Sequence, residues 1–241
     1  ETPWEMLRLD TPAGRWPGPV FRARRILRRA APDLLCTYNW GAMDWAFANS
    51  WLVHRPHLHF ESGFGPEEAE RTLPRRDLFR QVALRRARAL IVPSQKLAQL
   101  ASARGWISTK RIRLIPNGVD VAWYSAGAGG HIEGAGALST APVVATVAPL
   151  RREKRLDRLI AAFARVCDRS AAELVIAGDG PCRRELEQLA TRLGVGERVR
   201  FLGHLNDVRP VLQQCRVFAM TSETEQMPNA LLQAMAMGCP V

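Results

Sequence analysis

Several features that mark special classes of protein are missing from this sequence. No stretch approaches about 20 uninterrupted apolar residues, the length that a membrane-spanning helix requires. The first residues, Glu1 to Arg8, lack the basic and then apolar pattern of a secretory signal. With 47% hydrophobic and 24% charged residues, the composition excludes disordered and fibrous proteins and is typical of a globular one.

Cysteine is scarce and follows no recognisable spacing. The number of cysteines is odd, and none belongs to a CxxC motif or to a Cys/His pattern with metal-ligand spacing. These observations argue against a disulfide framework and against a zinc site. We therefore expect small buried hydrophobic side chains in a reducing cytoplasm. The residues concerned are Cys36, Cys167, Cys182, Cys215 and Cys239.

Acidic residues are too few to balance the basic ones, and the formal net charge is +11. Residues 1–120 carry 20 Lys and Arg against 11 Asp and Glu, whereas residues 121–241 carry 14 against 12. The first half therefore favours an anionic partner, either a membrane surface or an acidic acceptor, and a solvated arginine-rich surface explains it equally well. Nucleic acid is disfavoured, because aromatic residues are not interleaved with the basic ones.

From Pro32 onward, the spacing of apolar residues predicts short strands that alternate with helices. This alternation is typical of a parallel sheet wrapped by helices. A basic helix is expected before this region, around Arg22–Arg29. The expected strands are Leu34–Tyr38, His57–Phe60, Ala89–Pro93 and Ile112–Ile115, and the expected helices are Trp45–Leu52, Asp77–Arg88 and Gln95–Arg104.

A glycine-rich stretch without apolar period separates this unit from a second one of the same kind. We expect a first domain over 1–122, a linker or flexible loop over 123–141 and a second domain over 142–241. The second domain has expected strands at Pro142–Val147, Glu173–Ala177, Val199–Phe201 and Val217–Met220. Helices carry Leu156 to Cys167 and Leu186 to Leu193, follow Asp207, and begin at Pro228.

The final helix runs into Gly238–Val241, where the pattern requires another strand. The first domain likewise lacks a strand before its basic helix. We therefore expect a fragment in which both domains are incomplete.

The segment from Thr221 to Val241 is the most informative part of the sequence. Glu225 lies in the loop after a strand and before a helix whose first backbone N–H groups can bind anions and hydroxyls. The segment resembles the signature of the large retaining group 1 glycosyltransferases. The resemblance implies that Glu225 contacts the donor sugar, together with the helix start at Pro228, Asn229, Ala230 and Leu231.

Two positions of the resembling segments depart from the family pattern. A second glutamate that contacts the ribose is replaced by Gln233, which keeps an acceptor and loses the charge. After the first strand of the second domain, Lys154 matches a diphosphate-binding lysine, but the matching arginine position holds Pro149. We expect Arg151 to substitute for that arginine, because it lies nearer the strand end than Arg152.

Three further segments follow the family order. The turns at Gly178, Gly180, Gly203 and His204 resemble the two loops that flank the nucleotide base. His59 precedes a glycine-containing loop, as does a family histidine that faces the donor sugar, although His57 lies on the same strand face. The turn from Ile115 to Asp120 resembles the passage between the two domains.

The resemblance implies a GT-B fold, in which two Rossmann-like domains with parallel sheets face each other across a cleft. It implies transfer of a sugar from a UDP- or GDP-sugar to a glycan or lipid-linked acceptor with retention of configuration, with Glu225, Lys154 and His59 as catalytic residues. No metal or other cofactor is expected, since an Asp-x-Asp pair is missing. The alternative is a nucleotide-sugar-binding protein without efficient turnover, which Gln233 and Pro149 favour.

Overall fold

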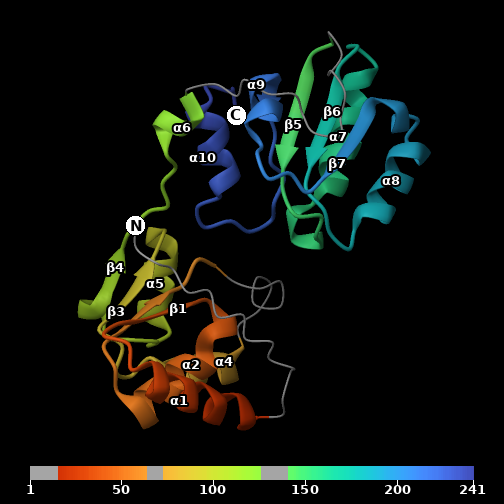
Figure 1. Ribbon diagram of the computed structural model, residues 1–241. Helices are drawn as coiled ribbons and strands as arrows, with labels where there is room; N and C mark the ends of the chain where they lie inside the picture. Colours follow the sequence, from red (N-terminus) through yellow and green to blue (C-terminus); the bar gives the residue numbers. More distant parts are fainter. Residues whose placement is uncertain (1–15, 64–72, 126–140) are drawn as a thin grey trace. The chain divides into compact units, whose positions relative to one another are not determined.

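The computed structural model describes residues 16–63, 73–125 and 141–241. The chain divides after Pro116 into two compact units, which are described one at a time. The division falls before the expected boundary at 122, because residues 117–125 pack on the second unit. Val121–Ser125, which overlap the start of the expected linker over 123–141, form helix α6 beside α10 (Figure 1). The remainder of that linker, 126–140, lies outside the described residues.

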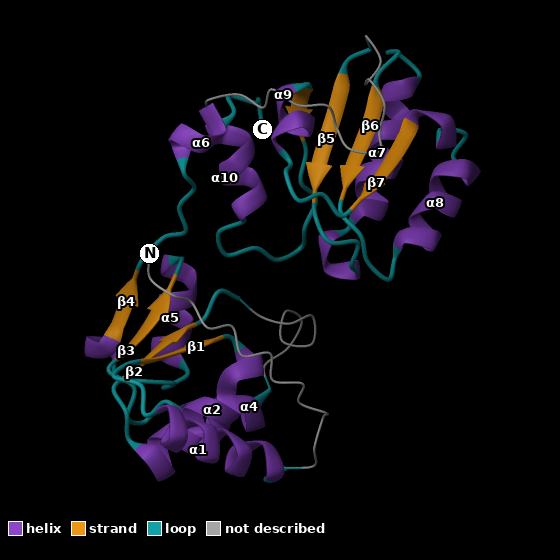
Figure 2. Ribbon diagram, in the orientation of Figure 1, coloured by secondary structure: helices purple, strands orange, loops and turns teal. Residues whose placement is uncertain are grey.

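The first unit contains a four-stranded parallel sheet with strand order β1-β2-β3-β4 (Figure 2). The strands are β1 (Leu35–Tyr38), β2 (His57–Phe60), β3 (Ala89–Val92) and β4 (Ile112–Leu114). All four expected strands are confirmed within a residue at each end. Short apolar runs between turn residues are therefore enough to locate these buried strands.

Four main helices accompany this sheet: α1 (Gly18–Ala30), α2 (Met43–Ala48), α4 (Pro74–Ala83) and α5 (Gln95–Ala103). The basic helix α1 is longer than expected and packs on α2 through Val20 and Ala23. The expected bounds of α4 were wrong. It begins at a proline, which suits a first helical position, and it ends before Arg88, whose N–H already donates to the strand residue His57.

The second unit is a four-stranded parallel sheet with strand order β7-β6-β5-β8. The strands are β5 (Val143–Val147), β6 (Glu173–Ala177), β7 (Val199–Gly203) and β8 (Cys215–Phe218). The last expected strand, Val217–Met220, was placed too late, because Cys215 already pairs with Val143. In Figure 2 the arrowheads of β5, β6 and β7 point the same way.

Helices cover both faces of the second sheet. Along β6, Leu174 and Ile176 pack with α7 and α8, whereas Val175 between them packs on the opposite face with α9. This alternation follows from the period of two along a strand. The helices of the second unit, besides α6, are α7 (Leu156–Cys167), α8 (Arg183–Arg192), α9 (Arg209–Gln213) and α10 (Asn229–Ala236).

Short helical turns complete the described elements. A π-helical turn over Asn49–Val53 continues α2. The remaining turns are 3₁₀-helices at Trp40–Ala42, Thr109–Arg111, Arg152–Lys154 and Gly196–Arg198.

All five cysteines are free thiols, of which Cys239 alone is buried as expected, three are half-buried and Cys36 is exposed. Cys36 is exposed, because it lies on the edge strand β1 and points away from the face on which its neighbour Thr37 is buried. Cys239 is buried, and its thiol donates to the carbonyl oxygen of Leu212 at 2.9 Å.

Candidate functional site

The strand order of the second unit creates a natural binding position at the carboxyl ends of β5 and β8. From β5 the chain proceeds to β6 and β7 on one side and then returns to β8 on the other side. The loops that follow β5 and β8 therefore leave the sheet in opposite directions. Ligands of open parallel sheets bind at such a reversal of strand order.

Lys154 and Glu225 meet at this position. Lys154 ends the 3₁₀-turn after β5, and Glu225 lies in the loop after β8. The Lys154 Nζ atom donates to Glu225 Oε1 at 2.5 Å, and the two side chains are 20% and 23% exposed. Two charged groups that are separated by 71 positions in the sequence are thus paired and largely removed from solvent.

Helix α10 begins beside this pair. Pro228 is its N-cap, and the first bond of the helix runs from Leu232 N to Pro228 O at 3.3 Å. The N–H groups of Asn229, Ala230 and Leu231 precede that bond, as in the first turn of any helix. The Asn117 side chain donates to the carbonyl oxygen of Met227 at 2.8 Å, and this bond fixes the backbone directly before the helix begins.

A cavity of about 390 Å³ lies at the carboxyl ends of β5, β6 and β7 and reaches α10. It brings together Gly178, His204 and Ala230, which were three of the expected donor-binding residues, and Pro149, which stands where the family pattern has arginine. Its other lining residues are Val147, Ala148, Ala177, Asp179, Leu205 and Val208. Apolar walls with a few polar groups suit a planar ring with hydrogen-bonding edges.

The glycines of this region permit close contact between backbones. A Cβ atom on Gly178, which has a φ of +142°, would lie 2.0 Å from the carbonyl oxygen of Ala148. Gly178 N–H also donates to Gly203 O at 2.7 Å, which joins the two expected glycine turns. These glycines therefore have a packing reason for being glycine as well as a place beside the cavity.

Neither Arg151 nor Gln233 lines the cavity. Arg151 is exposed at the start of the 3₁₀-turn that ends with Lys154. Gln233, on α10, hydrogen-bonds the Tyr124 hydroxyl of α6. Burial and the nearby Asp207 raise the pKa of Tyr124, whereas Arg209 and this hydrogen bond lower it. The expected donor-binding roles of both residues stay predictions.

His59 is fully buried in the first unit and belongs to a polar cluster. Its Nδ1 atom and the Nε2 atom of His57 each lie 2.7 Å from Thr37 Oγ1. Glu61 Oε2 lies 3.9 Å from His59 Nε2 and accepts from Arg80 Nε at 3.3 Å. Because the Thr37 hydroxyl has one proton, it donates to one imidazole and accepts from the other. A proton on His59 Nε2, the nitrogen nearer to Glu61, would make Thr37 the donor to His59 and the acceptor from His57. The expected catalytic role of His59 stays a prediction.

This cluster predicts that stability falls in acid. Burial, and then the charge of His59, lower the pKa of His57 from 6.5 to about 4. Because the folded pKa lies below the unfolded one, the unfolded chain binds the additional proton between these values. The free energy of unfolding should therefore fall with pH from about 6.5 to 4, by at most about 1.4 kcal/mol per pH unit.

Urea denaturation at a series of pH values measures this effect. The His57→Gln variant should lose the corresponding part of the slope, whereas the His204→Gln variant should keep it. An equal slope in wild type and His57→Gln would show that other groups account for any acid sensitivity.

Several residues of the site were missed from the sequence. Glu223 was interpreted as a surface carboxylate, which its exposure confirms, but its hydrogen bonds from Arg155 and Arg158 were not expected. Thr221 donates to the carbonyl oxygens of Lys154 and Arg155. No local pattern signals these contacts, because each joins the loop after β8 to the loop after β5.

Among the described residues, no group of three or more His, Cys, Asp or Glu side chains is arranged to hold a metal ion. A search of the same residues found no helix with the length and apolar character that crossing a membrane requires.

Comparisons with known proteins match both units. A family model described as "Glycosyltransferase Family 4" matches residues 3–123, and one described as "Glycosyl transferases group 1" matches residues 141–241. The lipopolysaccharide core biosynthesis glycosyltransferase LpsE of Rhizobium meliloti is 42% identical over 101 residues, which is 42% of this chain and 29% of that protein. The D-inositol 3-phosphate glycosyltransferase of Mycolicibacterium gilvum is 30% identical over 246 residues, covering 92% of this chain and 53% of that protein.

A similar architecture occurs among solved structures. Anabaena Alr3699/HepE, determined in complex with UDP-glucose, has a TM-score of 0.79 and 24% sequence identity, and the match covers 96% of this chain and 64% of that one. The present chain thus spans less than two thirds of the length of each of these three proteins.

Proposed function

This chain belongs to Glycosyltransferase Family 4 and has the GT-B glycosyltransferase fold, and we propose that it transfers a sugar from a UDP- or GDP-sugar to a glycan or lipid-linked acceptor. The observation that carries the proposal is the Lys154–Glu225 pair at the reversal of strand order, beside a cavity of about 390 Å³. The cavity would hold the base, which leaves the diphosphate and the sugar near the charged pair.

Each member of the pair has a chemical role in this proposal. Lys154 would move from Glu225 to the diphosphate, where a fixed positive charge stabilises the negative charge that develops as the nucleotide leaves. Glu225 would then accept hydrogen bonds from donor-sugar hydroxyls and orient the anomeric carbon. The first N–H groups of α10 would add donors for phosphate or hydroxyl oxygen atoms.

We propose that the anomeric configuration is retained. In this scheme Glu225 accepts hydrogen bonds from donor-sugar hydroxyls and Glu223 is paired with Arg155 and Arg158, so neither carboxylate is assigned as a covalent nucleophile. Attack by the acceptor hydroxyl from the side of the departing diphosphate agrees with this arrangement. In that scheme the acceptor oxygen bonds to the anomeric carbon as the bond to the phosphate oxygen breaks, and that phosphate oxygen takes the acceptor proton.

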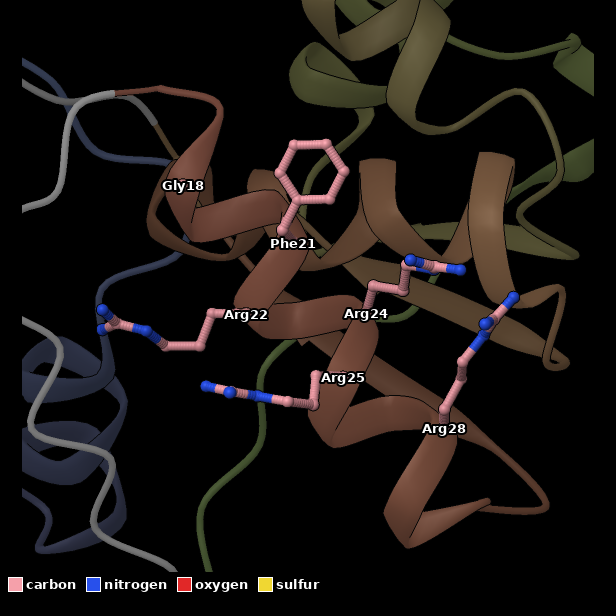
Figure 3. A pocket seen from close by; sticks show the side chains of 6 residues that line it. All are labelled: Gly18, Phe21, Arg22, Arg24, Arg25 and Arg28. Carbon is pink, nitrogen blue, oxygen red and sulfur yellow. The ribbon is translucent and has the colours of Figure 1, made fainter.

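The acceptor side is proposed to contact an anionic lipid surface through α1. The helix buries Val20, Ala23 and Leu27 and leaves Phe21 exposed. Figure 3 shows Arg22 and Arg25 extending to one side of α1 and Arg24 and Arg28 to the other, at a hollow of about 580 Å³. According to their names, one relative of this chain acts on a diphospho-undecaprenol-linked sugar and another on a phosphatidylinositol.

Vesicle sedimentation tests this contact. Each arginine near an anionic surface contributes roughly 1 kcal/mol, so the Arg22→Gln/Arg25→Gln variant should bind phosphatidylglycerol vesicles on the order of tenfold or more weakly at low salt. The Arg165→Gln/Arg192→Gln variant, with the same change in charge on exposed positions of α7 and α8, is the control. Equal losses in the two variants, or no binding by the wild type, would refute a specific role of α1.

The proposed transfer reaction is tested by calorimetric titration of the chain with UDP, GDP and their sugar conjugates, followed by an assay for sugar release or transfer. Binding of one nucleotide together with turnover supports the enzyme. Binding without turnover supports the alternative of a nucleotide-sugar-binding protein, which Pro149 and Gln233 favour. A folded chain that binds none of these compounds would contradict both functions.

A further inference from the structure

The loops that carry Lys154 and Glu225 are joined by a second set of polar contacts. Thr221 Oγ1 donates to the carbonyl oxygens of Lys154 at 3.1 Å and Arg155 at 2.9 Å. The backbone N–H of Glu223 donates to Glu153 O at 3.0 Å. The loop after β8 is therefore hydrogen-bonded to the loop after β5 at Thr221 and Glu223, close in sequence to the charged pair.

Arg155 is the centre of these contacts. Its guanidinium donates to both oxygens of Asp157, at 3.0 and 2.9 Å, and also to Glu223 Oε1. Arg158 donates to the same Glu223 oxygen at 3.0 Å. The hydrogen bonds to Asp157 and then to Glu223 raise the pKa of Arg155, and the arginine in turn lowers the pKa of Asp157. The single carboxylate of Glu223 thus binds two arginines, the N-cap Arg155 and Arg158 in the first turn of α7.

The backbone of Arg155 has an unusual conformation for its residue type. It is the N-cap of α7, with φ +47° and ψ +41°, which is the left-handed region that residues with a Cβ atom avoid. Glycine would adopt this conformation at no cost. The contacts of the Arg155 side chain compensate for this unfavourable backbone conformation. The contact that is most distant in the sequence is the one to Glu223.

We propose that Arg155 and Glu223 are positioning residues that hold Lys154 and Glu225 in register for the diphosphate and the sugar of the donor. The inference rests on the proposed function for its ligand. Lys154 directly precedes Arg155, and Glu225 lies two residues after Glu223, so the two ion pairs connect the same loops at adjacent positions. Without the Arg155–Glu223 contact, the loop after β8 keeps its backbone bonds but loses the charged contact nearest to Glu225.

Glu223→Gln is the main test, because it removes the charge and keeps the size of the side chain. We expect affinity for UDP to fall about fivefold while affinity for UMP, which lacks the second phosphate, stays unchanged. Both side chains are partly exposed, so salt should reduce the difference between variant and wild type. The control is Glu187→Gln, which disrupts the exposed Arg183–Glu187 pair of α8 and should alter neither affinity.

The Arg155→Gly variant distinguishes a positioning role of Arg155 from a role in the stability of the fold. Glycine relieves the left-handed backbone, so the thermal unfolding midpoint should stay equal or rise, yet affinity for UDP should fall as in Glu223→Gln. Wild-type affinity for UDP in both variants, or an equal loss for UMP and UDP, would overturn the proposal.

Hydrogen exchange tests the contact without any ligand. In Glu223→Gln the amides of residues 153–155 and 221–225 should exchange faster together, and those of α8 should not change. Unchanged exchange in both loops would overturn the proposal even if wild-type protein binds nucleotide. If the wild type binds neither UDP nor GDP, the proposed function fails, and the exchange result still decides whether the contact holds the two loops together.

Discussion

Replacing Lys154 with alanine is expected to weaken binding of the preferred nucleoside diphosphate by roughly 10- to 100-fold, which corresponds to a charge-assisted hydrogen bond of about 1.5–3 kcal/mol. The loss has two causes. The ammonium that would bind the diphosphate is removed, and the Glu225 carboxylate, which it neutralises at 2.5 Å, is left facing an anionic ligand.

Titration calorimetry with UDP and GDP measures this effect. Lys154→Arg should recover part of the affinity, because it keeps the charge on a longer and planar group. Lys96→Ala, on an exposed position of α5, removes one lysine elsewhere and should bind as wild type does. Wild-type affinity in Lys154→Ala would place the diphosphate away from this lysine and would refute the site.

Glu225→Gln is expected to reduce sugar transfer on the order of 100-fold, a typical loss when one preorganised group at the reacting centre is removed. Binding of UDP alone should respond in the opposite direction. Lys154 loses its partner in this variant, so UDP should bind as tightly as in the wild type or more tightly. The additional affinity of the UDP-sugar over UDP should disappear, because Glu225 is proposed to contact the sugar.

Parallel titration of UDP and the UDP-sugar, together with a turnover assay, distinguishes these effects. Glu185→Gln on α8 is a control for the loss of one exposed carboxylate. Weaker binding of UDP in Glu225→Gln would contradict the proposed competition for Lys154. Unaltered turnover would exclude Glu225 from the reaction.

The strands of both units could be predicted closely, because each is a short apolar run bounded by turn residues. β2 and β6 were expected with the bounds that the structure has. Helix ends were harder. The apolar pattern after Asp77 continues to Arg88, but α4 stops at Ala83, where the backbone turns to bring Arg88 to β2. The spacing of apolar residues indicates which face of a helix is buried. It does not indicate where the sheet lies, and therefore not where the helix must end.

The outline of the site could also be predicted, while its contacts could not. Lys154 and Glu225 were each identified from a segment that follows a strand, and the structure pairs them. His59 was expected to face the donor sugar, which stays a prediction, and its contacts with Thr37 and Glu61 in a buried cluster had no local signal. Gln233 was expected to face the ribose, which stays a prediction, and its hydrogen bond to Tyr124, a residue inside the expected linker, had no local signal.

The sequence by itself determined the family, the alternation of strands and helices, and the order of the loops along the chain, because these depend on local pattern and on residue identity. Only the tertiary structure decided which loops meet. The order β7-β6-β5-β8 places the loops after the first and last of these strands in the chain side by side, and so joins Lys154 to Glu225 and Arg155 to Glu223. Ion pairs between residues about 70 positions apart leave no periodic trace in a sequence, since they require only that two strands be neighbours in the sheet.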